Sequence, residues 1–300
     1  MIHALHDRPK PSSWLDSEIR RLRIRSSRLV TSIFAGEYRT AFRGRGIEFE
    51  EVREYQPGDD IRSIDWNVTA RSGRPFVKQF VEEREMTVMI LLDQSASLAG
   101  STPRGTKSQV AVEICALLAL AAARSNDRVG LMTFTDRIER YLAPAKGPRH
   151  AQRLMAELQR SPGGQGTDLA AALTYLQRVQ RRASILIIVS DFLSADFRLP
   201  LLAAAKRHDV LAVSVTDPVD ADLPDLGLLR VVDAETGRCR LIDTGDGKVR
   251  AAYREHAARR QTDVARLFDA AGLEHLVVGS DTSPVQVLTR FFTDRQRRSR

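Results

Sequence analysis

The stretch "MTVMILLDQSAS", residues 86–97, decides the fold class. Its first part is a short, nearly all-apolar run that follows charged residues and ends in Asp93 and small polar residues. Such a run predicts a strand buried on both faces, which is typical of parallel sheets covered by helices. A second stretch, "ASILIIVSD" at 183–191, has the same character and also ends in an aspartate, Asp191.

Strand-like and helix-like stretches alternate throughout the region that begins at residue 86. "VAVEICALLALAAA" (110–123) and "GGQGTDLAAALTYLQRVQRR" (163–182) contain helices, whereas "DVLAVSVTD" (209–217) and "EHLVVGSD" (274–281) are typical of buried strands. This alternation predicts an α/β fold with a doubly wound, mostly parallel sheet that has helices on both faces.

Shifts in composition divide the chain into four parts. "QPGD" and "RSGRP" are turn signals between short strand-like stretches, which predicts a small β unit ahead of the α/β domain. The predicted parts are a basic helical segment (1–42), the small β unit (43–85), the α/β domain (86–295, with a β excursion at about 217–246) and a basic tail (296–300).

Positive charge is concentrated at the two ends of the chain. The formal net charge is +8, and residues 1–46 carry ten Arg or Lys against four Asp or Glu. Residues 290–300 carry five Arg against Asp294. Such ends could bind a polyanion, but we favour solvated termini, because aromatic residues are only 6% of the chain and no nucleic-acid motif is present.

Cysteine usage and hydropathy indicate a cytoplasmic protein. The two cysteines, Cys115 and Cys239, form neither a disulfide framework nor a zinc-binding spacing, which favours a reducing compartment. The N-terminal residues lack the apolar core of a signal peptide. The longest apolar stretch contains Glu113 and is too short to span a bilayer, so no transmembrane segment is expected.

Polar side chains at the predicted strand ends form a candidate metal site. If the strands that end at Asp93 and Asp191 are neighbours, their exits meet, and the loop "GGQGTD" lies beside them. The candidate ligands are Asp93, Ser95, Ser97, Thr167 and Asp191. Carboxylate and hydroxyl oxygens suit Mg²⁺, with Mn²⁺ or Ca²⁺ as alternatives. Each residue taken alone could instead start a turn or cap a helix, and Asp168 is expected to be a cap and not a ligand.

The block "EVREYQPGDDIRSIDW", residues 51–66, has two interpretations. Its charged residues could form an interaction surface; they are Arg53, Glu54, Asp59, Asp60, Arg62 and Asp65. Alternatively, the block is a turn with ion pairs that hold the β unit on the main domain, with Trp66 as a packed anchor. We favour the second interpretation.

Two groups of motifs resemble known families. "DQSAS", the "GT" before a helix and the strand-end "SD" match the three parts of the metal-ion-dependent adhesion site of von Willebrand factor A domains. The stretch "GRGIEFEEVREYQPGDDIRSIDWNVTAR" (44–71), which runs into that strand, resembles the bacterial family catalogued as domain of unknown function 58. Members of that family commonly accompany MoxR-type AAA+ ATPases, and the biochemical function of the family is poorly defined.

The resemblance implies a role for each candidate ligand. Ser95 and Ser97 are expected to bind the ion directly, and Thr167 directly or through water. Asp93 and Asp191 are expected to bind it directly or through water. An open coordination position would then accept an Asp or Glu carboxylate from a partner protein.

These observations predict a non-enzymatic, metal-dependent protein-binding module that works as an adaptor or partner of a MoxR-type ATPase in protein assembly or maturation. We find no nucleophile–base pair, no Walker A loop after "GGQG" and no G-x-S-x-G motif. One alternative is a metal-dependent hydrolase or phosphatase with Asp93 as nucleophile or ligand. Another is a basic surface that binds nucleic acid or anionic lipid.

Overall fold

The computed structural model describes most of the chain from residue 85 onward and shorter stretches before it. The described residues are 52–56, 59, 61, 64, 66–78, 85–98, 101–102, 105–194, 196–233, 235 and 237–298, together with Tyr38 and Ala41. The predicted N-terminal segment, residues 1–42, lies outside the described residues except for these last two.

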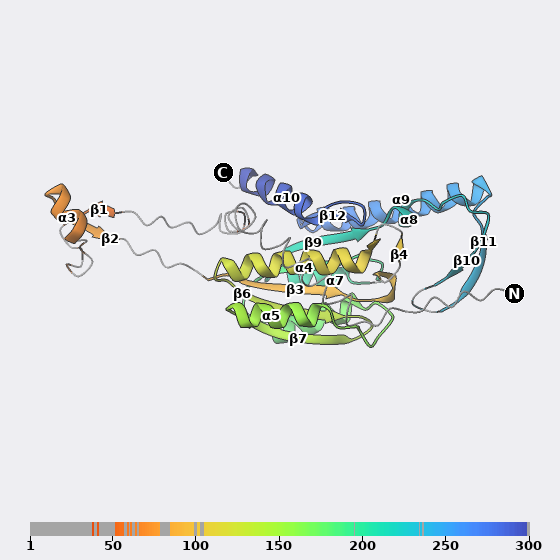
Figure 1. Cartoon of the computed structure of the whole chain (residues 1–300), viewed down its shortest axis with the longest axis horizontal. Coiled ribbons are helices and arrows are strands. Elements are labelled where there is room, and N and C mark those ends of the chain that lie inside the picture. Colours follow the sequence, from red (N-terminus) through yellow and green to blue (C-terminus); the bar gives the residue numbers. More distant parts are fainter. Residues whose placement is uncertain are drawn as a thin grey trace.

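A six-stranded sheet forms the centre of the α/β domain (Figure 1). Its strands, in spatial order, are β12 (Glu274–Gly279), β9 (Asp209–Thr216), β8 (Ile185–Ser190), β3 (Thr87–Asp93), β6 (Arg128–Phe134) and β7 (Ile138–Ala145). Every neighbouring pair is parallel except β6 with β7. The predicted α/β class, with a doubly wound, mostly parallel sheet, is confirmed.

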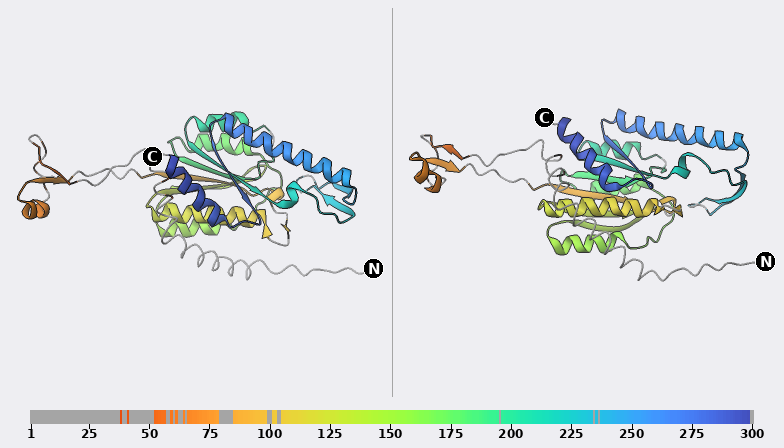
Figure 2. Two further views of the ribbon diagram at one scale, coloured as in Figure 1. Left: turned by 90° about the horizontal axis from the view of Figure 1, so that it is seen from above. Right: turned by 45° about the horizontal axis from the view of Figure 1, so that its top comes forward.

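Helices cover both faces of this sheet (Figure 2). One face packs against α4 (Lys107–Arg124), α5 (Pro148–Leu158) and α10 (Pro284–Arg298), and the other against α6 (Leu169–Val179), α7 (Arg198–Ala205) and α9 (Gly247–Ala270). Side chains of a strand alternate between faces, so in β3 Ile90 joins the first core and Leu91 the second. Burial on both faces explains why β3 and β8 are almost entirely apolar.

The strand order places the topological switch point of the sheet, called the crevice below, between β3 and β8. From β3 the chain continues to β6 and β7 on one side of the sheet, and it then returns to β8 on the other side. Helices that leave neighbouring strands in opposite directions leave space between the strands' carboxyl ends, and ligands of doubly wound sheets bind there. This crevice therefore lies at Asp93 and Ser190, the last residues of β3 and β8.

The described part of the predicted β unit contains two strands and a helix. Antiparallel strands β1 (Val52–Glu54) and β2 (Phe76–Lys78) flank α3 (Trp66–Ser72), which the sequence analysis did not predict. Thr69 on this helix accepts a hydrogen bond from the Phe76 N–H at 3.0 Å, which ties the helix to β2. The prediction that Trp66 is a packed anchor is wrong, because this residue is 67% exposed.

Shorter elements complete the described fold. A 3₁₀ turn, η3 (Ala96–Leu98), follows β3, and β4 (Ser101–Thr102) pairs with β5 (Gly105–Thr106). The predicted excursion at 217–246 contains α8 (Pro218–Ala221) and the antiparallel hairpin of β10 (Leu228–Val232) and β11 (Cys239–Asp243). Among the residues described, no helix has both the length and the apolar character needed to cross a membrane.

Close packing in the sheet gives a test of the fold at Gly130 in β6. A Cβ at this position would lie 2.7 Å from the Met89 sulfur and 2.9 Å from Cγ of Pro144. The Gly130→Ala variant is therefore expected to lower the free energy of unfolding by about 1–3 kcal/mol, as overpacking does elsewhere. Urea denaturation measures this change. Gly247→Ala is the control, because a Cβ there meets nothing within 4 Å, and an equal loss in both variants would contradict this packing.

Candidate functional site

Asp93 ends β3 and is held by hydrogen bonds on both carboxylate oxygens. The Ser95 N–H donates to Oδ1 at 2.8 Å, and the Ser190 hydroxyl donates to Oδ2 at 2.6 Å. Asp93 is only 1% exposed. Burial, followed by the charge of Asp191, raises the pKa of Asp93 to about 6, although the bonds from Ser190 and Ser95 oppose the shift. This carboxylate is therefore mostly ionised at neutral pH.

The two serines that follow Asp93 face each other where β3 leads into the η3 turn, with Ser95 just before the turn and Ser97 within it. Their hydroxyl oxygens lie 3.0 Å apart, and Ser95 is 1% exposed. The Ala96 N–H between them donates to the Gln165 carbonyl at 2.9 Å. This bond joins the turn after β3 to the glycine-rich loop that carries Thr167, so the two predicted segments of the site are neighbours.

The glycine-rich loop is positioned by Glu139 of β7. The N–H of Gly164 donates to Glu139 Oε1 at 2.7 Å, and the Thr135 hydroxyl donates to the same oxygen at 2.8 Å. Burial alone would raise the pKa of Glu139, but donors from Gly163, Thr135 and Gly164 outweigh it and hold the pKa at about 2. Glu139 was not predicted as part of the site, because nothing in its local sequence marks it.

Thr167 and Asp168 have different roles at the end of this loop. Asp168 caps α6 by accepting a hydrogen bond from the Ala171 N–H at 2.8 Å, as the sequence analysis predicted. The Thr167 hydroxyl donates to Glu235 Oε1 at 2.6 Å. Thr167 therefore points its hydroxyl away from the cap and toward a carboxylate of the β10–β11 hairpin.

Asp191, one residue beyond β8, forms a buried ion pair that the sequence analysis missed. Lys107 Nζ lies 3.1 Å from Asp191 Oδ2 and 3.0 Å from Asp220 Oδ2. The side chains of Lys107 and Asp191 are only 5% and 4% exposed. Burial alone would lower the pKa of Lys107, but the charges of Asp191 and Asp220 outweigh it and raise the pKa. Lys107 is therefore a fixed cation beside the candidate site.

The segments that carry the five candidate ligands thus lie next to one another at the crevice between β3 and β8. Hydrogen bonds connect Asp93 to Ser95 and Ser95 to Ser97. The bond between Ala96 and Gln165 places the loop of Thr167 beside them. The charge of Asp191 helps to raise the pKa of Asp93. Their donor atoms are two carboxylates and three hydroxyls, a set that fits a hard divalent cation. No group of three or more His, Cys, Asp or Glu that could hold a metal occurs among the described residues.

The second candidate set, the charged residues of 51–66, makes contacts within the small β unit where it is described. Glu54 pairs with Arg74 at 3.0 Å, and both side chains are more than half exposed. Asp59 accepts a hydrogen bond from the Gln56 N–H at 2.9 Å within the turn. Arg53 contributes its backbone to β1, and Asp60, Arg62 and Asp65 lie outside the described residues. An interaction surface here stays a prediction.

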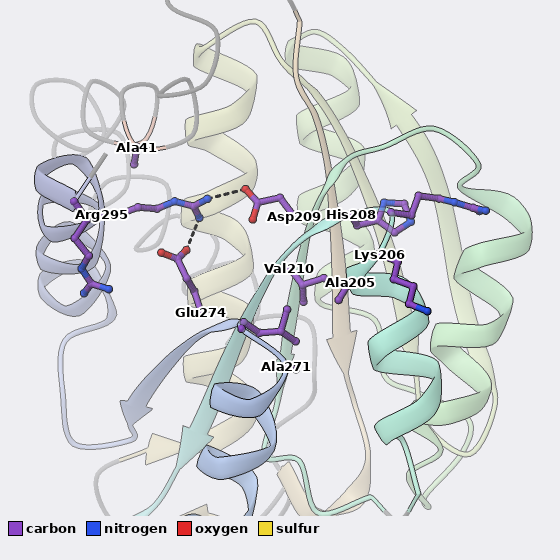
Figure 3. Close-up of a pocket in the computed structure, with 13 residues that line it drawn as sticks. Ala41, Ala205, Lys206, His208, Asp209, Val210, Ala271, Glu274 and Arg295 are labelled. Atoms are coloured by element: carbon purple, nitrogen blue, oxygen red, sulfur yellow. Dashed lines mark hydrogen bonds and ion pairs between the residues drawn. The ribbon is translucent and has the colours of Figure 1, made fainter. Parts of the chain in front are cut away.

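A cavity of about 670 Å³ lies at the opposite end of the sheet (Figure 3). It opens where β9 and β12 begin, and Arg295 of α10 reaches across it to Asp209 and Glu274, with both N–O distances 2.6 Å. Burial raises the pKa of Glu274, although the Arg295 charge opposes the shift. These charges pair with one another and fasten α10 to the sheet, far from the strand ends that carry the candidate ligands.

Comparison with known proteins identifies the family. The model of the family described as "Protein of unknown function DUF58" matches residues 51–263. The chain belongs to the DUF58 family. The resemblance noted in the sequence is thereby confirmed, and the match includes both the 51–66 block and all five candidate ligands.

Relatives of this DUF58 chain are uncharacterized proteins. Rv1480 of Mycobacterium tuberculosis is 33% identical over 99% of this chain and 93% of its own length. A protein of Paracoccus denitrificans, described as "in moxR 3'region", is 34% identical over 34% of this chain and 90% of its own length.

Solved structures similar to the DUF58 chain share little sequence with it. BatB from Bacteroides thetaiotaomicron has 18% identity and a TM-score of 0.46, over 71% of this chain and 99% of BatB. Proximal thread matrix protein 1 from the mussel byssus, with a zinc-occupied MIDAS motif, has 13% identity and a TM-score of 0.35, over 44% of this chain and 38% of that one.

The Lys107 ion pair gives a first test of the site. Lys107→Met keeps the apolar stem but leaves Asp191 and Asp220 without their cation. The variant is expected to lose about 3–5 kcal/mol of unfolding free energy, as when one partner of a buried pair is removed. The control is Lys146→Met, whose ion pair with Glu85 is partly exposed, so that its loss should change the unfolding free energy far less. Equal losses in denaturant titrations would contradict a buried structural role for Lys107.

The low pKa of Glu139 predicts a pH dependence of stability. Because the folded-state pKa is depressed to about 2, the stabilisation is present above the ordinary value of 4.5 and is lost as pH falls toward 2. The difference in unfolding free energy between wild type and Glu139→Gln should therefore shrink over that range. Denaturant titrations at several pH values measure it, and a constant difference would show that the Glu139 charge does not hold the loop.

Proposed function

We propose that this chain is a metal-dependent protein-binding module that binds an Asp or Glu carboxylate of a partner protein through the metal ion. The observation that carries the proposal is the gathering of Asp93, Ser95 and Ser97 in one hydrogen-bonded group at the sheet's switch point. Thr167 and Asp191 approach the same crevice from two further loops. Each of these residues alone has an ordinary structural role, but their convergence on one crevice is typical of a binding site.

The electrostatics of the site favour a divalent cation, which we propose to be Mg²⁺, with Mn²⁺ or Ca²⁺ as alternatives. Asp93, Asp191 and Asp220 are three carboxylates, and Lys107 is one ammonium, so the group has a formal charge of −2 when all are ionised. A divalent cation balances this charge. When bound, the ion would offer an open position to a carboxylate oxygen from outside.

The residues of this chain have separate tasks in such a site. Ser190 and the Ser95 N–H hold the orientation of the Asp93 carboxylate, and Ser95 and Ser97 present adjacent hydroxyl oxygens. Lys107 holds Asp191 while neutralising part of the local charge. The preorganised arrangement lowers the conformational cost of binding, which otherwise subtracts from affinity.

We further propose that the partner is a MoxR-type AAA+ ATPase or a protein on which it acts, with this chain as an adaptor in assembly or maturation. The support is the P. denitrificans relative, whose description places it in the moxR 3' region. A carboxylate on the partner fits the chemistry of the site, since the cation and the hydroxyls together favour an anionic oxygen ligand.

Catalysis is the less favoured alternative. A nucleophilic Asp93 would need a free oxygen directed at a substrate. In this chain both oxygens already accept hydrogen bonds, and the residue is 1% exposed. This environment suits a carboxylate that is held in place, and we therefore propose binding and not hydrolysis.

The hypothesis that the basic ends of the chain bind nucleic acid or anionic lipid is also less favoured. In α10, the guanidinium of Arg295 is engaged with Asp209 and Glu274 and is only 15% exposed. This arginine therefore stabilises the packing of α10 against the sheet, and its charge is not available to bind an anion from outside. Binding to nucleic acid or lipid through Arg295 would have to break these ion pairs.

We propose a cytoplasmic location for the protein. The supporting observation is that Cys239 is an exposed free thiol and Cys115 a buried one. Burial raises the pKa of the Cys115 thiol well above its usual range, so this residue is an inert core side chain. Free thiols persist in reducing compartments, whereas oxidising compartments favour disulfides.

Titration of Mn²⁺ followed by calorimetry tests the metal site. Asp93→Asn and Thr167→Val are each expected to weaken Mn²⁺ binding by more than about tenfold, because each removes an oxygen ligand or its charge. The matched controls are Asp168→Asn, which loses a neighbouring carboxylate but still caps α6, and Thr174→Val, which loses a hydroxyl that bonds only to the Ala170 carbonyl on α6.

A pull-down of a MoxR-type ATPase in Mg²⁺ and in chelator tests the partner. Capture is expected in Mg²⁺ with wild type and to be lost in chelator or with Asp93→Asn. If the two site variants keep wild-type affinity for Mn²⁺, the metal-centred mechanism is wrong. Metal binding that depends on Asp93, combined with capture that is insensitive to metal, would refute only the proposed partner.

A further inference from the structure

Glu235 brings a carboxylate of this chain to the edge of the candidate site. The residue lies in the connection between β10 and β11, 68 residues from Thr167 in sequence, and its Oε1 accepts the Thr167 hydroxyl at 2.6 Å. The hairpin itself lies beyond the carboxyl end of β3 in the different views of the molecule (Figures 1 and 2). Two segments distant in sequence therefore meet at one of the five candidate ligands.

Hydrogen bonds within the tip of the hairpin fix the backbone around Glu235. The Asp233 carboxylate accepts a hydrogen bond from the Glu235 N–H at 3.0 Å, and the Asp233 carbonyl accepts one from the Gly237 N–H at 2.8 Å. Gly237 has φ = +68°, a backbone conformation that favours glycine. The turn is closed further by a 2.8 Å bond from the Asp233 N–H to the Arg238 carbonyl. The position of Glu235 thus follows from the geometry of the turn.

We infer that Glu235 is the chain's own occupant of the carboxylate-binding position, and that a partner's carboxylate binds by displacing it. The inference rests on the proposed function, in which an external Asp or Glu binds at the open position of a cation that has Thr167 among its candidate ligands. In the structure, the group that approaches this hydroxyl is a carboxylate of the same chemistry. The partner class is therefore a protein with an exposed Asp or Glu that can enter where the hairpin tip now lies.

Charge explains why the occupant is displaceable and why it depends on the cation. Lys107 is already engaged by Asp191 and Asp220, so it does not neutralise Glu235. The carboxylates of Asp93 and Asp191 make this end of the sheet negative, so a bound cation would strengthen the attraction of a further carboxylate to it. Glu235 is itself exposed, so an incoming carboxylate has access to its position.

Competition of this kind has a measurable cost for the partner. A ligand that binds only the open form of a site has its apparent affinity reduced by the fraction of molecules that are open. If the hairpin carboxylate occupies the position in about nine of ten molecules, removing it raises partner affinity about tenfold. The hairpin tip would then determine how high the intrinsic affinity of a carboxylate-bearing partner must be for it to bind.

Glu235→Gln tests the inference, because glutamine keeps the size and hydrogen-bonding oxygen of the side chain but removes its charge. The probes are Mn²⁺ and N-acetylglutamate α-amide, a small molecule with a single side-chain carboxylate. Relaxation of water protons in the Mn²⁺-loaded protein reports the access of solvent to the ion. The control is Glu255→Gln on α9, whose carboxylate pairs with Arg259 on the same helix, with both side chains largely exposed.

In Glu235→Gln, water relaxation by the bound Mn²⁺ should increase, and the concentration of N-acetylglutamate α-amide that half-reverses it should fall about tenfold. Glu255→Gln should match wild type in both measurements. If Glu235→Gln matches Glu255→Gln while Asp93→Asn abolishes Mn²⁺ binding, the inference is overturned and the proposed function stands. If Asp93→Asn binds Mn²⁺ as wild type does, the proposed function fails and the inference fails with it.

Discussion

The parallel pairing of β3 with β8 is the constraint on which the candidate site depends. Five residue pairs hold these strands in register, from Val88 with Ile185 to Leu92 with Val189. This register places the Ser190 hydroxyl 2.6 Å from the Asp93 carboxylate, across 97 residues of sequence. A shift of one residue would turn each side chain of one strand to the opposite face and separate the two groups. The cores on both faces of the sheet therefore also fix the chemistry at its edge.

Charge is the second determinant of this edge. Buried carboxylates are costly unless a cation or hydrogen bonds stabilise them. Asp93 has hydrogen bonds on both oxygens and yet a pKa of about 6, whereas Asp191 has an ion pair with Lys107. The site thus combines a carboxylate that still gains from a nearby cation with one that already has such a partner. This asymmetry is compatible with the proposed metal site, in which Asp93 would gain a cation that Asp191 already has in Lys107.

Much of the fold could be predicted from the sequence, because strands buried on both faces give short apolar runs such as the one that ends at Asp93. The neighbouring positions of β3 and β8 also follow from the usual order of doubly wound sheets. Lys107, by contrast, could not be assigned to the site. It begins a helix whose remaining pattern is apolar, and the direction of its side chain depends on the packing of α4 against the sheet. Asp220 and Glu235 lie in the excursion, where local pattern does not determine position.

The helix α3 and the exposure of Trp66 show another limit of prediction. Residues 66–72 contain β-branched and polar residues that fit a strand as well as a helix, and the tie between Thr69 and Phe76 selects the helical turn. An aromatic residue beside charged ones suggests a packed anchor, but its burial depends on contacts that a local pattern does not contain. Both differences fall in a small unit. Such a unit buries little surface, so it has few long-range contacts that could override local preferences.

The candidate ligands lie on parts of the structure that differ in how easily they open. Asp93 and Ser190 end strands with several neighbours, and the amide hydrogens of such central strands exchange with solvent only through large unfolding events. Thr167 lies on a loop, and Glu235 lies at the tip of a two-stranded hairpin whose Leu228 and Leu241 are more than 60% exposed. Paired strands of this kind open at low free-energy cost. The hairpin side of the crevice can therefore open at a lower free-energy cost than the strand side.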